Sequence, residues 1–132
     1  MALPIKRQLE MSGVNLLVDT NFLIYLLNGN SAVKPYLGNQ FFISEVTEME
    51  MLGVKEIPAT ILKTRAALIR NCFLVNLNSD IKDIAIRIKQ KISFSLPDAI
   101  VAASALHLSL PLVTADKDFN RIAGLDLRLL KL

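Results

Sequence analysis

Residues 97–116, PDAIVAASALHLSLPLVTAD, contain a long apolar segment followed by a short apolar run that ends close to an acidic residue. Proline is favoured in the first turn of a helix, and residues 99–108 are apolar or small nearly all round, which predicts a helix buried on most of its sides. Residues 112–114 then predict a short buried strand. A buried helix leading into an apolar strand is typical of an α/β domain with a parallel sheet.

The same alternation of short apolar runs and longer helical patterns extends outward from this stretch. Residues 16–19, 41–44, 73–76 and 127–130 have the pattern of strands. Within residues 80–92, apolar side chains recur at helical spacing and predict a helix that packs one stripe against a neighbour. We therefore predict an α/β fold with a central, mostly parallel sheet of about five strands and helices on both faces.

The size and composition of the chain indicate one domain. A chain of 132 residues can bury about two-thirds of its unfolded surface without a disulfide, and no repeat or linker divides it. We assign residues 1–13 to an N-terminal extension and residues 14–132 to the domain. At 52% hydrophobic residues the chain is rich in apolar side chains for its size, so we expect a partner, at least a second copy, to cover the excess.

No apolar run reaches the roughly 18–20 residues that a membrane span requires, because polar residues and proline interrupt the longest one. The first residues lack a hydrophobic stretch followed by a small-residue cleavage site, so we expect a cytoplasmic protein. Cys72 is the only cysteine, which excludes an intramolecular disulfide and a cysteine-rich metal site.

Three aspartates lie where a ligand site of an open α/β sheet is expected, beyond the carboxyl ends of strands. Asp19 follows one strand, Asp116 follows another, and Asp98 lies in the first turn of the buried helix. Each could simply cap a helix. Together they favour a site, because several carboxylates brought close together repel one another unless a cation compensates them.

A fourth acid is expected among Glu45, Glu48 and Glu50, which lie close together in one helical run. At about 100° per residue, Glu50 shares a face with apolar neighbours, whereas Glu48 lies about 160° away. We therefore expect Glu50 to point inward and Glu48 to face solvent. A carboxylate on an apolar helical face is unusual, so Glu50 is the better candidate for the site.

Four short motifs in this order and spacing resemble the PIN domains, and specifically the toxins of the VapC family. They are Val18-Asp19-Thr20-Asn21, Ser44-x-x-Thr47-x-x-Glu50, Pro97-Asp98-Ala99-x-x-Ala102 and Thr114-x-Asp116-x-Asp118-Phe119. One such motif alone would be weak, but four in register along the chain make a strong signal.

The resemblance implies roles for particular residues. It makes Asp19, Glu50, Asp98 and Asp116 the metal-binding and catalytic acids. Asp118 matches a further acid that is often present in the family, and Asn21 and Thr47 match polar positions that line the site. Mg²⁺, or Mn²⁺ in its place, suits such a site because it prefers carboxylate oxygens and retains several waters, one of which can be activated for attack on a phosphate.

The function that the resemblance implies is that of a Mg²⁺- or Mn²⁺-dependent endoribonuclease, the toxin of a toxin–antitoxin pair. It also implies a homodimer, a VapB-like antitoxin as partner, and RNA as substrate, with tRNA and rRNA as candidate targets. The net charge of +3 is a mild basic bias. With four acids held on metal, the basic residues would exceed the remaining acids by seven, and we expect Lys89, Lys91, Lys117 and Arg121 to contact RNA phosphates.

Other classes of protein fit less well. A haloacid-dehalogenase-type phosphatase needs a second aspartate two residues after the first, where this chain has Asn21. A response-regulator receiver needs a pair of adjacent acids that the chain lacks. The remaining alternative is a non-catalytic PIN domain that serves as an RNA- or protein-binding scaffold, because a fold alone does not establish an activity.

Overall fold

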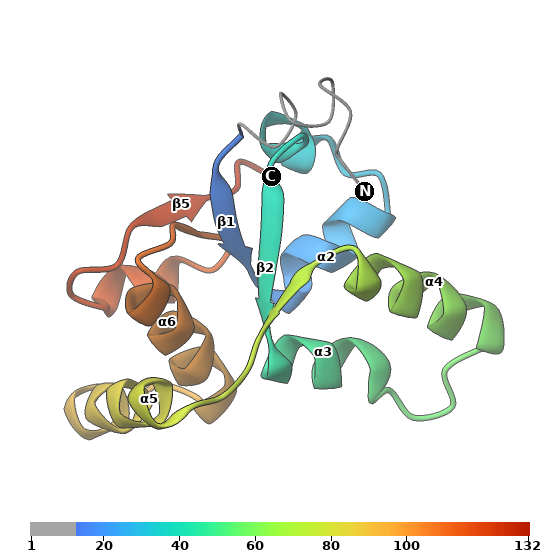
Figure 1. Cartoon of the computed structure of the whole chain (residues 1–132). Helices are drawn as coiled ribbons and strands as arrows, with labels where there is room; N and C mark the ends of the chain where they lie inside the picture. Colours follow the sequence, from blue (N-terminus) through green and yellow to red (C-terminus); the bar gives the residue numbers. More distant parts are fainter. Residues whose placement is uncertain (1–12) are drawn as a thin grey trace, which may run out of the picture.

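The computed structural model of the protein describes residues 13–132, so the expected N-terminal extension lies outside the described residues except for Gly13. A five-stranded sheet forms the centre of the domain (Figure 1). All its strand pairs are parallel, in the order β3-β2-β1-β4-β5. The strands are β1 (Asn15–Val18), β2 (Gln40–Ser44), β3 (Phe73–Val75), β4 (Leu112–Thr114) and β5 (Leu127–Leu129). The predicted α/β class and parallel sheet are confirmed, with each strand within one residue of its predicted bounds.

Helices connect the strands and cover both faces of the sheet. They are α2 (Thr20–Leu27), α3 (Glu45–Leu52), α4 (Ala59–Arg70), α5 (Ser79–Lys91) and α6 (Leu96–Leu108), with two 3₁₀ helices, η1 (Ser31–Tyr36) and η2 (Lys117–Arg121). The two helices predicted near residues 80–92 and 97–108 are confirmed as α5 and α6. Among residues 13–132, no helix combines the length and the apolar character that crossing a bilayer would require.

The alternation of side chains along β1 divides the core into two layers. Leu16 and Val18 pack with α2 and with Ile69 of α4 on one face of the sheet. Leu17 points to the other face, where it packs with α5 and α6. Figure 1 shows these helix pairs on opposite sides of the central strands. The sheet is therefore buried on both faces, which explains why its strands are apolar throughout.

Helix α6 is the most deeply buried helix of the domain. Its residues from Ala99 to Ala105 are all buried, as the apolar sequence predicted. Several of them are alanines, and these small side chains let α5 pack closely through Ile81 and Ala85. Fully burying a side chain the size of Ile81 stabilises the fold by about 1.5–3 kcal/mol. This packing fixes the first turn of α6, where Asp98 lies, against the rest of the domain.

Candidate active site

The candidate site lies beyond the carboxyl ends of the strands. Asp19 directly follows β1, and Asp116 lies two residues beyond β4, which is the direct neighbour of β1. On the other side of β1, strand β2 leads into α3, which carries Glu50. Because parallel strands end at one edge of a sheet, the fold brings these acids to one end of the domain.

Asp19 is buried, with 9% of its surface exposed, and both of its carboxylate oxygens accept hydrogen bonds. Oδ1 accepts from the backbone N–H of Phe22 at 2.9 Å and thereby caps α2. Oδ2 accepts from the hydroxyl of Thr114 at 2.5 Å. The capping interpretation is therefore correct for Asp19, but the same carboxylate is also tied to β4.

Thr114 connects the acids of the two neighbouring strands. Its side chain is fully buried, and its hydroxyl oxygen accepts a hydrogen bond from the backbone N–H of Asp116 at 3.0 Å while it donates to Asp19. The Asp116 carboxylate caps η2 by accepting from the N–H of Asp118 at 2.9 Å. One hydroxyl thus sets the relative positions of two of the four predicted acids.

Asp98 is not the cap of its helix. The N-cap of α6 is Ser95, whose hydroxyl oxygen accepts from the backbone N–H of Asp98 at 3.2 Å. The capping interpretation is wrong for Asp98, because a serine three residues earlier already fills that position. Asp98 remains in the first turn, where the helix dipole favours a negative charge.

Glu50 lies on a different side of α3 from the one expected. The buried residues of α3 are Thr47 and Met51, whereas Glu50 is exposed and Glu48 is partly buried. The expectation that Glu50 points inward and Glu48 to solvent is therefore wrong. Glu50 nevertheless belongs to the acidic region, because its Oε1 accepts a hydrogen bond from the hydroxyl of Thr20 at 2.6 Å, directly beside Asp19.

Burial and mutual repulsion raise the pKa of two of these acids. The pKa of Asp19 is raised mainly by burial, although the hydrogen bonds from Thr114 and Phe22 oppose the rise, and repulsion from Asp98 and Asp116 adds to it. The pKa of Asp98 is raised by burial, against hydrogen bonding with Ser95, and then by repulsion from Asp116, Glu50 and Asp118. The acids are thus close enough to influence one another electrostatically.

Among residues 13–132, no basic side chain forms a salt bridge with these acids. The salt bridge in this part of the chain joins Arg128 to Asp126 on the surface, at 3.1 Å. Hard divalent cations prefer carboxylate oxygens, so the chemistry of the donor set fits Mg²⁺ or Mn²⁺. In the described part of the chain, however, no three acidic, histidine or cysteine side chains lie close enough to hold an ion as they stand. Binding would require side-chain rotation, which is easiest for the exposed Glu50.

The other predicted site residues differ in their exposure. Asn21 and Asp118 are exposed, whereas Thr47 is fully buried and its hydroxyl has no hydrogen-bond partner among the described residues. The residues expected to contact RNA are all on the surface, namely Lys89, Lys91, Lys117 and Arg121. Lys89 also has a structural role, since its ammonium group donates to the carbonyl oxygen of Phe94 at 2.6 Å.

Three hydroxyl residues that contact the acids received no role from the sequence: Thr20, Ser95 and Thr114. A signal was present for Ser95, because a serine three residues before an acid is a capping pattern. The contacts of Thr20 and Thr114 join residues 30 and 95 positions apart, so they depend on strand order and could not be found from local spacing.

Comparisons with known proteins agree with this fold. The PIN domain family profile matches residues 16–125. A toxin–antitoxin complex from Klebsiella pneumoniae contains a chain with 33% identity and a TM-score of 0.71, covering 83% of this chain and 94% of that one. A search of curated protein sequences gives no match.

Two further solved structures are similar in fold at lower identity. VapBC2 from Rickettsia felis, bound to a DNA fragment from its promoter, has a TM-score of 0.73 at 19% identity, covering 89% of this chain and 99% of that one. VapBC-1 from nontypeable Haemophilus influenzae has a TM-score of 0.73 at 21% identity, with coverage of 88% and 97%.

The fold and these matches define an α/β domain of a nuclease family. The chain belongs to the PIN domain family. In keeping with its resemblance to VapC-type toxins, the chain is 33% identical to a chain of a toxin–antitoxin complex. It also shares its fold with the VapBC structures.

Proposed function

We propose that this protein is a Mg²⁺- or Mn²⁺-dependent endoribonuclease that acts in the cytoplasm as the toxin of a toxin–antitoxin pair. The observation that carries the proposal is the meeting of several acids at one edge of the sheet, where Thr114 ties Asp19 to Asp116 and repulsion from neighbouring acids raises the pKa of Asp98. Such an arrangement is unfavourable without a cation, and it is the arrangement that a metal-dependent phosphodiesterase needs.

In this proposal Asp19, Glu50, Asp98 and Asp116 hold the cation, with Asp118 as a further acid at the rim. A bound Mg²⁺ or Mn²⁺ would polarise the phosphate and lower the pKa of an attacking water. The chain itself supplies positioning: the Thr114 hydroxyl orients Asp19, and the Thr20 hydroxyl holds Glu50 beside it. No serine or cysteine nucleophile is required by this chemistry.

The proposed partners are a VapB-like antitoxin and a second copy of the chain. The antitoxin is proposed because the similar structures from Klebsiella pneumoniae and Haemophilus influenzae are complexes of a toxin with its antitoxin. The second copy is proposed because of an exposed apolar patch, which we name the β3–α5 patch. It consists of Phe73, Leu77, Ile86 and Leu96, each between 43% and 57% exposed.

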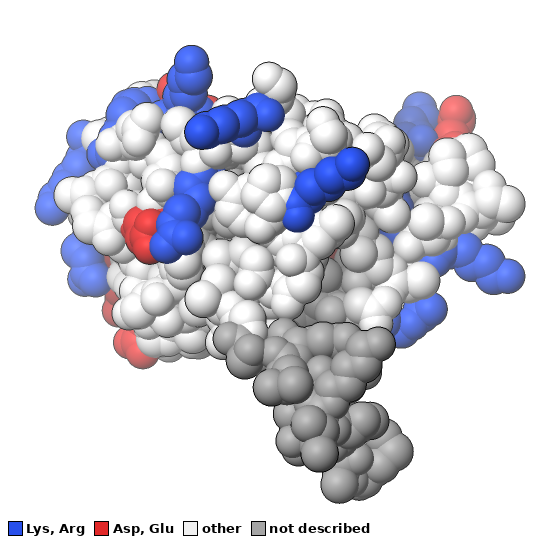
Figure 2. All heavy atoms as spheres, turned by 90° about the horizontal axis from the view of Figure 1, so that it is seen from above, with Lys and Arg blue, Asp and Glu red and all other residues white. Residues whose placement is uncertain are grey.

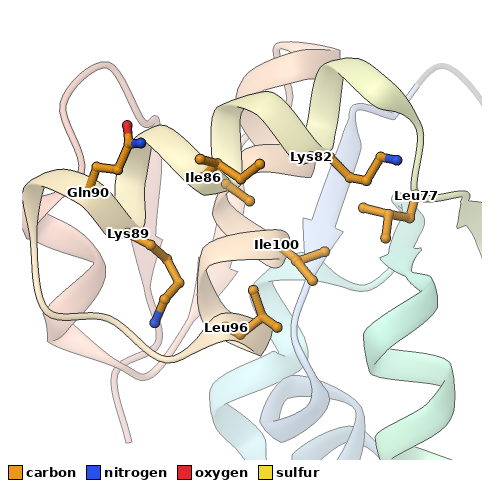
Figure 3. Close-up of a pocket in the computed structure, with 8 residues that line it drawn as sticks. Leu77, Lys82, Ile86, Lys89, Gln90, Leu96 and Ile100 are labelled. Atoms are coloured by element: carbon orange, nitrogen blue, oxygen red, sulfur yellow. The ribbon is translucent and has the colours of Figure 1, made fainter.

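The β3–α5 patch borders a groove of about 530 Å³ between α5 and the start of α6. Figure 3 shows Leu77, Leu96 and Ile100 around this groove, with Lys82 and Lys89 beside it. Because β3 is an edge strand, the patch continues to the border of the sheet. An exposed apolar face of this kind is typical of an interface, and a two-fold dimer would pair the patch with itself.

A ribonuclease assay tests the catalytic proposal. Cleavage of RNA by wild type and by Asp98→Asn is compared in Mg²⁺ or Mn²⁺ and in a chelator. Asp83→Asn, at an exposed position of α5, is the matched control. We expect cleavage by wild type and the control with metal only, and none by Asp98→Asn. Cleavage that survives the chelator or the Asp98 substitution would contradict the metal mechanism. RNA binding without any cleavage would favour the non-catalytic scaffold.

Expression in a bacterial host tests the toxin role separately. Wild type should arrest growth, whereas Asp98→Asn at the same protein level should not. Equal growth of the two strains would leave a nuclease without toxicity and would remove the toxin part of the proposal.

A further inference from the structure

A pocket with a basic rim lies between α5, α6 and the end of η2, and we name it the α5–η2 pocket. It has a volume of about 300 Å³. Its floor is apolar and includes Ile88, Leu106 and Ile122, whereas Arg87, Lys91 and Arg121 lie on its rim. No acidic residue of the described part of the chain lines it. A pocket of this size, with an apolar floor and a few charged groups, has the character of a ligand site.

The cations on the rim have no acidic partner among the residues that the structure describes. Within residues 13–132 the salt bridge joins Arg128 to Asp126, so no carboxylate there lies within 4 Å of Arg87, Lys91 or Arg121. Arg87 and Lys91 are four residues apart on α5 and therefore share a face, where like charges repel. Figure 2, which views the molecule from above, shows more Lys and Arg than Asp and Glu side chains on the face that it presents. An anionic ligand would relieve this repulsion.

Arg121 is held in place by an aromatic ring. Its guanidinium carbon lies 5.7 Å from the ring centre of Phe94, which in turn packs edge-on against the buried Phe119 at 5.3 Å. The Arg121 side chain remains exposed on the side away from the ring. An arginine fixed in this way offers a surface on which an unpaired base can stack.

We propose that the α5–η2 pocket binds one unpaired nucleotide of the RNA strand, with its base on the apolar floor and beside Arg121 and its phosphate on the rim cations. This inference rests on the proposed function, because it assigns a subsite for the RNA. Asp116 caps the start of η2 and Arg121 ends it, so at the 3₁₀ rise per residue the pocket begins about 10 Å from Asp116. About three stacked nucleotides span that distance.

The pocket predicts a preference for single-stranded RNA. In an RNA duplex the bases are stacked and paired, and side chains cannot enter the deep, narrow groove. The apolar floor can contact a base only when that base is turned out of the stack. A site that bound phosphates alone would depend on the rim cations and not on the apolar floor.

Fluorescence anisotropy with the full chain in chelator measures binding without cleavage. The probes are a labelled single-stranded RNA, its duplex, and an abasic ribose-phosphate strand of the same length. Ala123→Trp fills the pocket without changing charge, and Ala59→Trp, at an exposed alanine of α4, is the matched control. We expect Ala123→Trp to weaken binding of the single strand about tenfold, in line with the loss of one stacked base, and to leave the abasic strand unaffected.

A second variant tests the rim and does not depend on the first. Arg121→Gln should lower the slope of log affinity against log salt by about 0.7, the contribution of one phosphate contact on a single strand. Lys34→Gln, on η1 at the opposite face of the sheet, should leave the slope unchanged.

The outcomes separate this inference from the proposed function. RNA binding that is unchanged by both Ala123→Trp and Arg121→Gln would overturn the pocket while leaving the nuclease intact. Equal weakening of the base-bearing and abasic strands by Ala123→Trp would overturn the base site. Absence of both RNA binding and cleavage would overturn the proposed function, and this inference with it.

Discussion

Replacing Thr114 with valine removes the hydroxyl that joins Asp19 to Asp116 and keeps the shape of the side chain. Two hydrogen bonds are lost at a fully buried position: the one donated to the Asp19 carboxylate at 2.5 Å and the one accepted from the Asp116 N–H at 3.0 Å. A hydrogen bond to a charged group contributes about 1.5–3 kcal/mol and a neutral one about 0.5–1.5 kcal/mol. We expect the free energy of unfolding to fall by about 2–4.5 kcal/mol.

Thermal unfolding followed by circular dichroism measures this loss. For a domain of this size a change of 1 kcal/mol moves the Tm by about 3–5 °C, so Thr114→Val should unfold roughly 10 °C lower than wild type. Thr114→Ser keeps the hydroxyl and is the matched control. It should retain most of the stability, because only a methyl group is lost.

The affinity for Mn²⁺ distinguishes a role in positioning the acids from a role in stability alone. Groups that orient metal ligands typically contribute about 10- to 100-fold to affinity, so titration calorimetry at a temperature where both variants are folded should show this loss for Thr114→Val and not for Thr114→Ser. An unchanged Tm and Mn²⁺ affinity in Thr114→Val, or equal damage in both variants, would refute the positioning role of the hydroxyl.

Three more predictions follow from the acids and from the apolar patch. Without metal, Asp98→Asn should raise the Tm at pH 7. The pKa of Asp98 is raised in the folded state, so its charged form opposes folding at neutral pH. The difference in Tm between the variant and wild type should vanish as the pH falls through the raised pKa to below 3.8. A Tm of Asp98→Asn below that of wild type at pH 7 would contradict this prediction. Millimolar Mn²⁺ should raise the Tm of wild type and leave that of Asp98→Asn nearly unchanged, and equal shifts would place the ion elsewhere. Light scattering should give a dimer mass for wild type and a monomer mass for Ile86→Glu. Val54→Glu, at an exposed apolar position outside the patch, is the control and should remain a dimer. A dimer mass for Ile86→Glu would show that the β3–α5 patch is not the interface.

The fold could be predicted from the sequence because its signals are local and redundant. Apolar runs of three or four residues alternate with helical patterns, and residues 99–105 of α6 are all buried, so the parallel α/β arrangement followed from the sequence pattern. The acids could be found for a related reason: Asp19 and Asp116 follow strands, and parallel strands end at one edge. The order β3-β2-β1-β4-β5 then made these two strands direct neighbours.

The parts that could not be predicted depend on contacts between distant residues. Helical periodicity selected Glu50 on the assumption that its face of α3 was buried. Glu50 is instead exposed, and the buried residues of α3 are Thr47 and Met51. The hydrogen bond between Thr114 and Asp19 spans 95 positions and becomes visible only when β4 is placed beside β1. Sequence spacing can identify candidate ligands, whereas the hydroxyls that hold them are a property of the packed domain.

The most direct test of the central claim is anomalous diffraction from crystals of the wild-type protein soaked in Mn²⁺. The account predicts a peak among Asp19, Glu50, Asp98 and Asp116, with the Glu50 side chain rotated toward the other three acids. Crystals of Asp98→Asn under the same conditions should lack the peak. A protein that cleaves RNA in Mn²⁺ but shows no ion among these four acids would contradict the account.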